Sequence, residues 1–405
     1  MNKGNTNRWI ILITGMIILL FLGLIYGWSI FRAPLSEFYP EWNTSQLSMA
    51  FTISMIFFCL GGFFSGLLLK KVSHKVILTT AAAVLFIGFF GVSMLDTGDS
   101  GKSLLMLYMF YGVLGGGGVG LGYNCVISTV NKWFADKAGL ASGVMMMGFG
   151  LGGIVLGGIV DVLIGNVGLF ATFKILAVSI AVILIAGVLL LKTPDVKAQA
   201  AKVQGFIEEE NFSPTQMMKK ASFWFFVLWC ILLNSAGLLV INNAATIAVA
   251  FGAPAVLGLI VSVCNGAGRV VIGEIFDRTG RKTSMLLNTI FVCAAGVFLL
   301  LGDMSSAAVV IIIGLLFTGL GYGGTPTLSS AFIMKQFGPK YYPVNFSICN
   351  FSLIPAAIVG PMVSSRLIDS SGGAYTSSFI MMIVLAGLAG VAWMMVNKFT
   401  ASDRA

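Results

Sequence analysis

Two polar residues lie in the apolar part of one stretch of the chain, which ends in a cluster of charge, and they have the types and the spacing to bind an anion. Arg269 lies in the middle of Val261–Lys282, which reads VSVCNGAGRVVIGEIFDRTGRK, and Asn265 lies one helical turn earlier, on the same face of the expected helix. A cation at membrane depth costs roughly 2.5–3.5 kcal/mol on insertion scales, so it usually faces a wet cavity or a partner. We therefore expect this face to line a pathway through a membrane and Arg269 to receive an anion there.

Arg269 also has structural interpretations. It lies close enough to the polar end of its stretch to reach the membrane surface, or it could pair with Glu274. Glu274 fits better in the charged cluster at the end of the stretch. Lys174 differs from Arg269 because it lies near the end of its own apolar stretch, where reaching the surface is cheap.

Five other residues inside apolar stretches could complete such a site. Tyr123, Asn124 and Tyr322 would supply hydrogen bonds, whereas Tyr26 and Met146 would supply an apolar wall. Each of the polar residues could instead serve as a hydrogen-bond partner between helices.

The sequence offers no constellation for catalysis. The single histidine, His74, lies in an expected loop, and no cluster of His, Asp or Glu has metal-ligand spacing. The six cysteines all fall in apolar stretches. The glycine runs Gly115–Gly122 and Gly148–Gly153 lie inside apolar helices rather than after a strand, so they favour close helix packing over nucleotide binding. We expect no enzymatic activity, no catalytic residue, no metal and no cofactor.

The composition indicates a membrane protein. Of the 405 residues, 58% are hydrophobic and 10% are charged, whereas soluble domains contain about 25% charged residues. The net charge of +9 lies in short loops between apolar stretches and not on a soluble basic face. This pattern argues against nucleic-acid binding.

Apolar stretches of about 20 residues predict an all-α membrane protein with twelve transmembrane helices. Alternate loops hold most of the 24 lysines and arginines, while the opposite loops hold Arg32, Lys102 and Arg366. This bias predicts cytoplasmic termini and a multi-pass protein of the cell membrane. The expected spans are 9–31, 47–69, 76–95, 103–127, 139–163, 168–191, 222–242, 254–276, 283–301, 307–332, 344–368 and 375–396.

An internal repeat divides the chain into two six-helix halves. GLLLKKVSHK at Gly66–Lys75 matches GEIFDRTGRK at Gly273–Lys282, and KWFADK at Lys132–Lys137 matches KQFGPK at Lys335–Lys340 with a similar offset. We expect an N-terminal half over 1–191, a cytoplasmic linker over 192–221 and a C-terminal half over 222–405.

The loop GEIFDRTGRK resembles the signature of the major facilitator superfamily. Its matching positions are Gly273, Asp277, Arg278, Gly280 and Arg281, and the first-half copy departs from the pattern. The resemblance implies the fold of that superfamily, with a loop that participates in conformational change. It also implies that the first, fourth, seventh and tenth helices line the cavity, which favours Tyr26, Tyr123 and Tyr322 as site residues.

Three further motifs resemble the oxalate/formate antiporters and the monocarboxylate transporters. They are YGWSIFRAPL at Tyr26–Leu35, NKWFADKAGLASG at Asn131–Gly143 and NGAGR at Asn265–Arg269. The resemblance implies that Arg269 binds the anion. The chain departs from the antiporters at Cys349–Gly360, which lacks their lysine, and from the proton-coupled transporters at Asn265, where they have an acid.

These features together predict a secondary transporter that moves small organic monocarboxylate anions, of the lactate, pyruvate or formate type, by alternating access. An oxalate/formate-type anion exchanger and an efflux transporter for hydrophobic drugs are the alternatives. The expected partners are the anion, a proton or counter-anion and membrane lipid. We expect no nucleic acid and a monomeric protein.

Overall fold

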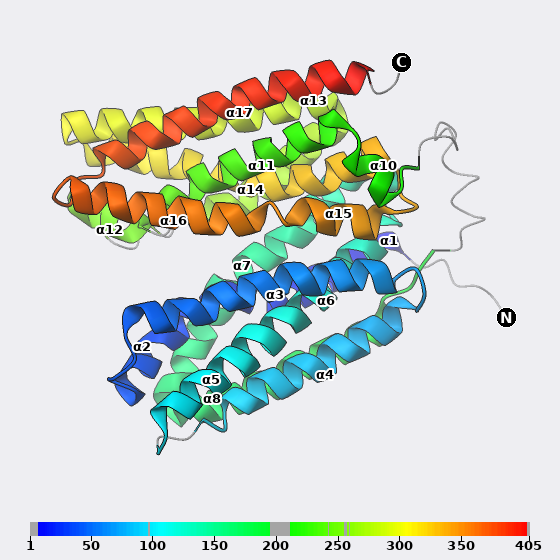
Figure 1. Cartoon of the computed structure of the whole chain (residues 1–405), viewed down its shortest axis with the longest axis vertical. Helices are drawn as coiled ribbons and strands as arrows, with labels where there is room; N and C mark the ends of the chain where they lie inside the picture. The colour runs from blue at the N-terminus through cyan, green and yellow to red at the C-terminus, as the bar shows by residue number, and fades with distance from the viewer. Residues whose placement is uncertain are drawn as a thin grey trace. The chain divides into compact units, whose positions relative to one another are not determined.

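A computed structural model describes residues 7–95, 98–194, 211–241, 243–254, 257–258 and 260–402. Within these ranges the regular secondary structure is helical and contains no strand (Figure 1). The all-helical architecture follows from the apolar stretches, because a helix satisfies every backbone polar group internally where no water is available.

Eleven helices in the described part of the chain are long and apolar enough to cross a membrane. One of them, α13 at Ile260–Ser305, is 46 residues long and contains a non-helical residue, Gly280, with φ 79° and ψ −178°. This left-handed φ favours glycine. The bend at Gly280 separates the two predicted spans 254–276 and 283–301, so α13 accounts for both.

The predicted span 344–368 forms two helices, α15 at Tyr342–Asn350 and α16 at Leu353–Ser370. Pro355 explains the interruption. It has no backbone N–H to donate to the carbonyl of Phe351, and in a continuous helix its ring would clash with that carbonyl. Phe351 and Ser352 accordingly form a turn.

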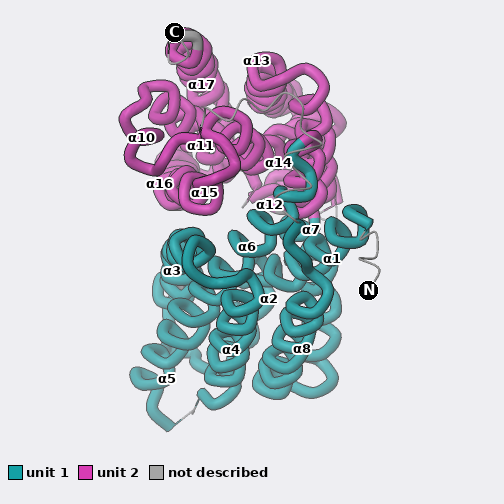
Figure 2. The backbone as a smooth tube through the Cα atoms, turned by 90° about the vertical axis from the view of Figure 1, so that its right-hand side faces the viewer, with its two compact units in different colours: residues 1–135, 148–206 teal, residues 136–147, 207–405 magenta. Residues whose placement is uncertain are grey.

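The helices of the described chain form two compact units, whose residues are distinguished in Figure 2. In unit 1, α3 packs against α6, and α4 packs against both α6 and α8. Its helices are α1 Arg8–Leu22, η1 Gly23–Gly27, α2 Trp28–Phe38, α3 Thr44–Leu68, α4 His74–Val92, α5 Ser100–Leu107, the π-helix η2 Tyr108–Gly115, α6 Gly116–Asn131 and α8 Leu169–Leu190.

In unit 2, α13 packs along α14, and α11 packs against α14, α16 and α17. Besides α13, α15 and α16, the helices of this unit are α10 Pro214–Met218, α11 Ala221–Ile241, α12 Ala244–Ala250, α14 Ala308–Phe337 and α17 Thr376–Ser402. Helix α7, Ala138–Val167, belongs to both units, because the segment Asp136–Met147 groups with unit 2 and the part from Gly148 onward groups with unit 1.

The two units run over Met1–Ala135 with Gly148–Phe206, and over Asp136–Met147 with Ile207–Ala405. The predicted halves over 1–191 and 222–405 remain a prediction. The middle of the predicted linker 192–221, at 195–210, lies outside the described residues.

Glycines account for the closest helix contacts in unit 1. A Cβ on Gly120 would lie 2.0 Å from the carbonyl oxygen of Phe58, and one on Gly116 would lie 2.2 Å from that of Ser54. Helix α6 therefore touches the backbone of α3, as the glycine run Gly115–Gly122 indicates.

Candidate functional site

Arg269 lies on α13 and its side chain is 4% exposed. Its Nε donates a hydrogen bond to Oδ1 of Asn265 at 3.1 Å, one helical turn earlier. Its Nη1 donates to the backbone carbonyl of Met146, in the α7 segment of unit 2, at 2.5 Å. These two contacts hold the guanidinium in a defined orientation between α13 and α7.

The charge of Arg269 has no counter-charge within the part of the chain that the structure describes. Both of its hydrogen bonds go to neutral oxygens, and Glu274 pairs instead with Arg278, whose Nε lies 2.6 Å from Oε1 of Glu274. A guanidinium has five N–H donors, so the two bonds leave donors on Nη1 and Nη2 for another group. A buried ion without a partner is costly, and an anion bound at Arg269 would remove that cost.

Glycines bring three helices of unit 2 together around Arg269. A Cβ on Gly143 of α7 would lie 2.3 Å from the carbonyl oxygen of Arg269. On the α14 side, a Cβ on Gly268 would lie 2.3 Å from the carbonyl of Leu320, and one on Gly323 would lie 2.1 Å from the carbonyl of Asn265. α13 is therefore packed backbone to backbone against both neighbours, which fixes the position from which Arg269 projects.

Tyr322 and Met146 also belong to this part of unit 2. Tyr322 is half-buried on α14, the helix that packs along α13, and its ring packs against Gly237 of α11. Met146 is fully buried and contributes its backbone carbonyl. The structure thus brings together four of the predicted site residues, Arg269, Asn265, Tyr322 and Met146.

Tyr26 and Tyr123 lie in unit 1, where they form part of an aromatic cluster. The ring of Phe149 is 5.2 Å from that of Tyr26 and 4.7 Å from that of Tyr123, and the ring of Phe58 is 5.1 Å from that of Tyr123. Tyr26 is 37% exposed, whereas Tyr123 is buried. This cluster combines an apolar surface with phenol groups from two helices.

Asn124 ties α6 to α3. Its Nδ2 donates to the carbonyl of Gly62 at 2.7 Å, and its Oδ1 accepts from the hydroxyl of Ser128 at 3.1 Å. The side chain is fully buried. These contacts match the structural alternative for this residue, a hydrogen-bond partner between helices.

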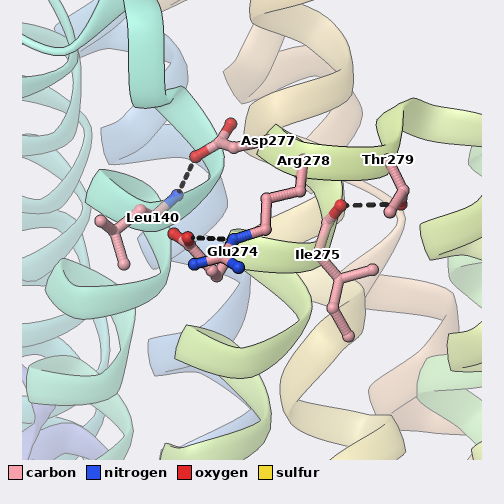
Figure 3. Close-up of polar contacts among 6 residues, drawn as sticks. All are labelled: Leu140, Glu274, Ile275, Asp277, Arg278 and Thr279. Atoms are coloured by element: carbon pink, nitrogen blue, oxygen red, sulfur yellow. Dashed lines mark hydrogen bonds and ion pairs between the residues drawn. The ribbon is translucent and has the colours of Figure 1, made fainter.

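The predicted loop motif supports the start of α7. Asp277 accepts hydrogen bonds from the backbone N–H of Gly139 at 2.9 Å and of Leu140 at 2.7 Å, and Figure 3 shows its carboxylate directed at Leu140. A carboxylate at a helix N-terminus satisfies unpaired N–H groups and interacts favourably with the helix dipole. Gly273 lets the two helices touch, since its Cβ would lie 2.3 Å from the carbonyl of Gly139.

The other motif residues have separate roles. The Glu274–Arg278 pair seen in Figure 3 is largely exposed on the Arg278 side, and exposed pairs of this kind contribute about 0–1 kcal/mol. Gly280 provides the bend in α13. Arg281 donates from Nη2 to Oδ1 of Asn397 on α17 at 3.2 Å.

Two features of potential functional relevance were not predicted. Phe149 stands at the centre of the unit 1 aromatic cluster, and nothing distinguishes it among the 32 phenylalanines of the sequence. Asp161 is an exposed carboxylate in the span Ala135–Val167. The sequence alone could have identified Asp161, because an ionisable residue within an apolar span is a functional candidate in its own right.

The chain is similar to known proteins over most of its length. The oxalate:formate antiporter of Oxalobacter formigenes is 25% identical over 394 residues, with 95% of this chain and 90% of the antiporter covered. Monocarboxylate transporter 10 of Mus musculus is 24% identical over 316 residues, covering 72% of this chain and 58% of that protein. The structure of the proton:xylose symporter XylE matches with a TM-score of 0.72 at 14% identity, covering 97% of this chain and 96% of the symporter.

The family model of the Major Facilitator Superfamily matches residues 8–353. This match covers most of the chain and includes α13 with its loop motif. It confirms the predicted superfamily, and with it the predicted fold and a multi-pass membrane protein. The chain is therefore a transporter of the major facilitator superfamily.

Proposed function

We propose that this transporter moves small organic monocarboxylate anions by alternating access, with Arg269 as the group that binds the carboxylate. The observation that carries the proposal is the state of Arg269: it is buried, oriented by two neutral acceptors, and without a counter-charge in the described residues. A carboxylate can take the remaining donors in a fork-like, charge-assisted contact. The similarity to an oxalate:formate antiporter and to a monocarboxylate transporter supports an anionic substrate.

Charge balance favours one carboxylate over two. A single guanidinium neutralises a single carboxylate, and a second carboxylate without a partner would be expensive in a dry interior. Cys349–Gly360, where the antiporters have a lysine, contains no basic residue. We therefore expect lactate, pyruvate or formate to be preferred over oxalate.

We infer exchange of anions in preference to proton symport. Asn265, which holds Arg269 in place, cannot titrate, whereas proton-coupled relatives have an acid at that position. Under proton symport, the exposed carboxylate of Asp161 would carry the proton. An Asp161→Asn variant separates symport from exchange: it should lose net uptake driven by a pH gradient if transport is symport, and it should take up acid like the wild type if transport is exchange.

Bound substrate would also permit the conformational change. If the site closed while empty, the guanidinium of Arg269 would remain without a counter-charge in a dry interior. A bound carboxylate compensates this charge, so closure becomes favourable when substrate is present. The proposed halves would then move around the substrate, and the bonds from Gly139 and Leu140 to Asp277 would break and re-form in each cycle.

The experiment is uptake of labelled acids into proteoliposomes, with and without unlabelled acid inside. The panel contains formate, lactate, pyruvate and oxalate, and a hydrophobic cationic dye represents drug efflux. We expect monocarboxylate uptake that the internal acid accelerates. Oxalate uptake tenfold faster than lactate or formate uptake would reject the charge-balance argument. Dye transport that is indifferent to the loss of Arg269 would identify a drug transporter instead. Uptake driven by a pH gradient alone and abolished by an uncoupler would establish proton symport.

A further inference from the structure

Unit 1 carries a groove of about 570 Å³ that the proposed transport site does not use. Phe57 and Phe64 of α3 and Val84 of α4 line it together with Leu114 of the π-helix η2. The groove is open to the surroundings, since Phe64 is 55% exposed. Its volume lies within the range of about 300–1,000 Å³ that ligand pockets occupy.

Gly117 of α6 lines the groove and leaves space in it. A Cβ on Gly61 of α3 would lie 2.2 Å from the carbonyl oxygen of Gly117 of α6, so the two backbones touch there. A Cβ on Gly117 itself would meet no atom within 4 Å. The missing side chain at 117 therefore leaves open space between tightly packed helices, and a larger residue there would fill the groove without a clash at its Cβ.

The groove combines an apolar body with a cation at one end. Thr80 on its wall donates its hydroxyl to the carbonyl of Val76 at 3.0 Å, so this hydroxyl is satisfied within its own helix. Lys71 lies in the connection between α3 and α4, is exposed, and has no acidic partner among the described residues. A ligand that suits these groups has a hydrocarbon chain and an anionic head.

The length of the groove corresponds to one leaflet of a bilayer. Phe57 and Leu68 both line it on α3, and at 1.5 Å per residue they are about 16 Å apart along the helix. Half of the hydrocarbon core of a bilayer is about 15 Å. A chain that enters beside Lys71 would therefore reach roughly the midplane.

We propose that this groove binds an acyl chain of an anionic phospholipid, with the lipid phosphate at Lys71. The lipid comes from the leaflet on the Lys71 side, which the loop charges predict to be the cytoplasmic one. Lys70 and Lys75 flank Lys71 in the sequence and strengthen the local attraction for anionic head groups. The bound lipid is distinct from the transported anion, and the transported anion takes no part in binding it.

The test compares two lipids that differ only in their head groups, dioleoyl phosphatidylglycerol and dioleoyl phosphatidylcholine, by native mass spectrometry of the purified protein. We expect one tightly bound phosphatidylglycerol. Lys71→Gln should weaken its binding roughly fivefold and weaken that of phosphatidylcholine less, because the choline cation offsets the charge of the phosphate. Gly117→Leu should weaken both lipids, because the added side chain occupies the position of the acyl chain.

Matched controls keep the result interpretable. Lys398→Gln removes an exposed lysine from α17, and Gly158→Leu adds a side chain at an exposed glycine of α7 whose Cβ would also meet nothing within 4 Å. Both should bind lipid as the wild type does, and thermal unfolding confirms that each variant is folded. A phosphatidylglycerol with a photoreactive acyl chain should crosslink to α3 and α6 in the wild type.

Three outcomes would overturn the proposal. The first is equal binding of phosphatidylglycerol by the wild type, Lys71→Gln and Gly117→Leu. The second is crosslinking spread over all helices. The third is a wild-type dimer in lipid nanodiscs that Gly117→Leu dissociates, since the groove would then be occupied by a second copy of this chain.

Discussion

At the scale of single residues, the transport proposal depends on one guanidinium. Arg269 is held by Asn265 and by the carbonyl of Met146, and neither contact neutralises its charge. Lysine would carry the same charge but could not reproduce the planar fork, so the charge and the geometry of the site can be tested separately.

Arg269→Gln should abolish carboxylate transport and leave the protein folded and inserted, because the substitution removes a buried charge. Arg269→Lys should retain weak transport with poorer affinity, since it presents a point charge in place of a fork. Initial rates of uptake into proteoliposomes measure both effects, and thermal unfolding reports folding.

The control is Arg366→Gln, which removes an exposed arginine from α16 of the same unit and should transport like the wild type. Carboxylate uptake by Arg269→Gln at near wild-type rates would show that the cation is structural. The assigned site would then be wrong.

Asn265 should affect affinity more than turnover, because its Oδ1 orients the Nε of Arg269 at 3.1 Å. Asn265→Ala should raise the KM for the anion several-fold and leave kcat largely intact. Asn265→Asp would place a carboxylate against Arg269, which competes with the substrate when ionised. Its protonation frees the guanidinium, so uptake by this variant should rise as the pH falls. A pH profile parallel to that of Asn265→Ala would contradict this role.

At the scale of helices, α13 owes its position to glycine contacts on both sides. Gly143→Ala should disrupt transport although alanine favours helices, because its Cβ would lie 2.3 Å from the carbonyl oxygen of Arg269. Overpacking of this kind costs about 1–3 kcal/mol. The lower unfolding temperature and the loss of uptake should appear together.

Gly158→Ala is the matched control on the same helix, since its Cβ meets nothing within 4 Å. It should leave both measurements unchanged or raise the stability slightly. Equal behaviour of the two variants would mean that α7 and α13 have room to separate at Gly143.

Asp277 should contribute measurably to the stability of the protein, because its carboxylate joins α13 to the N-terminus of α7. Asp277→Ala removes both acceptors of the Gly139 and Leu140 N–H groups, and loss of a helix cap costs about 0.5–2 kcal/mol. The expected result is a lower unfolding temperature together with slower turnover.

Glu274→Gln is the control for Asp277→Ala, since it alters only the ion pair with Arg278, whose side chain is 75% exposed. It should change the unfolding temperature little. A larger effect for Glu274→Gln than for Asp277→Ala would assign the support of this region to the exposed pair instead.

At the scale of the whole molecule, the loop charges predict the orientation in the membrane. A reporter fused at Ala405 should report the cytoplasm, and single cysteines introduced within 96–103 should react with an impermeant reagent added from outside. Labelling of that loop from the inside alone would reverse the orientation. It would also place the proposed lipid in the opposite leaflet.

The sequence by itself determined the membrane class and the positions of the helices, and it singled out Arg269 as the candidate anion-binding residue. These are local properties: the length of an apolar stretch decides whether it can cross a bilayer, and a cation within one is detectable without knowing its neighbours. Gly280 and Pro355 could be predicted for the same reason, because their effects on the backbone are intrinsic.

The tertiary structure alone decided which groups these residues meet. The carbonyl that orients Arg269 belongs to Met146, 123 residues away, and the amides that bind Asp277 are those of Gly139 and Leu140. Asn124 binds α3, and Gly117 borders a groove. Such partners depend on which helix faces pack together, and small differences in side-chain packing set those faces. An apolar sequence that is hydrophobic on nearly every side does not specify them locally.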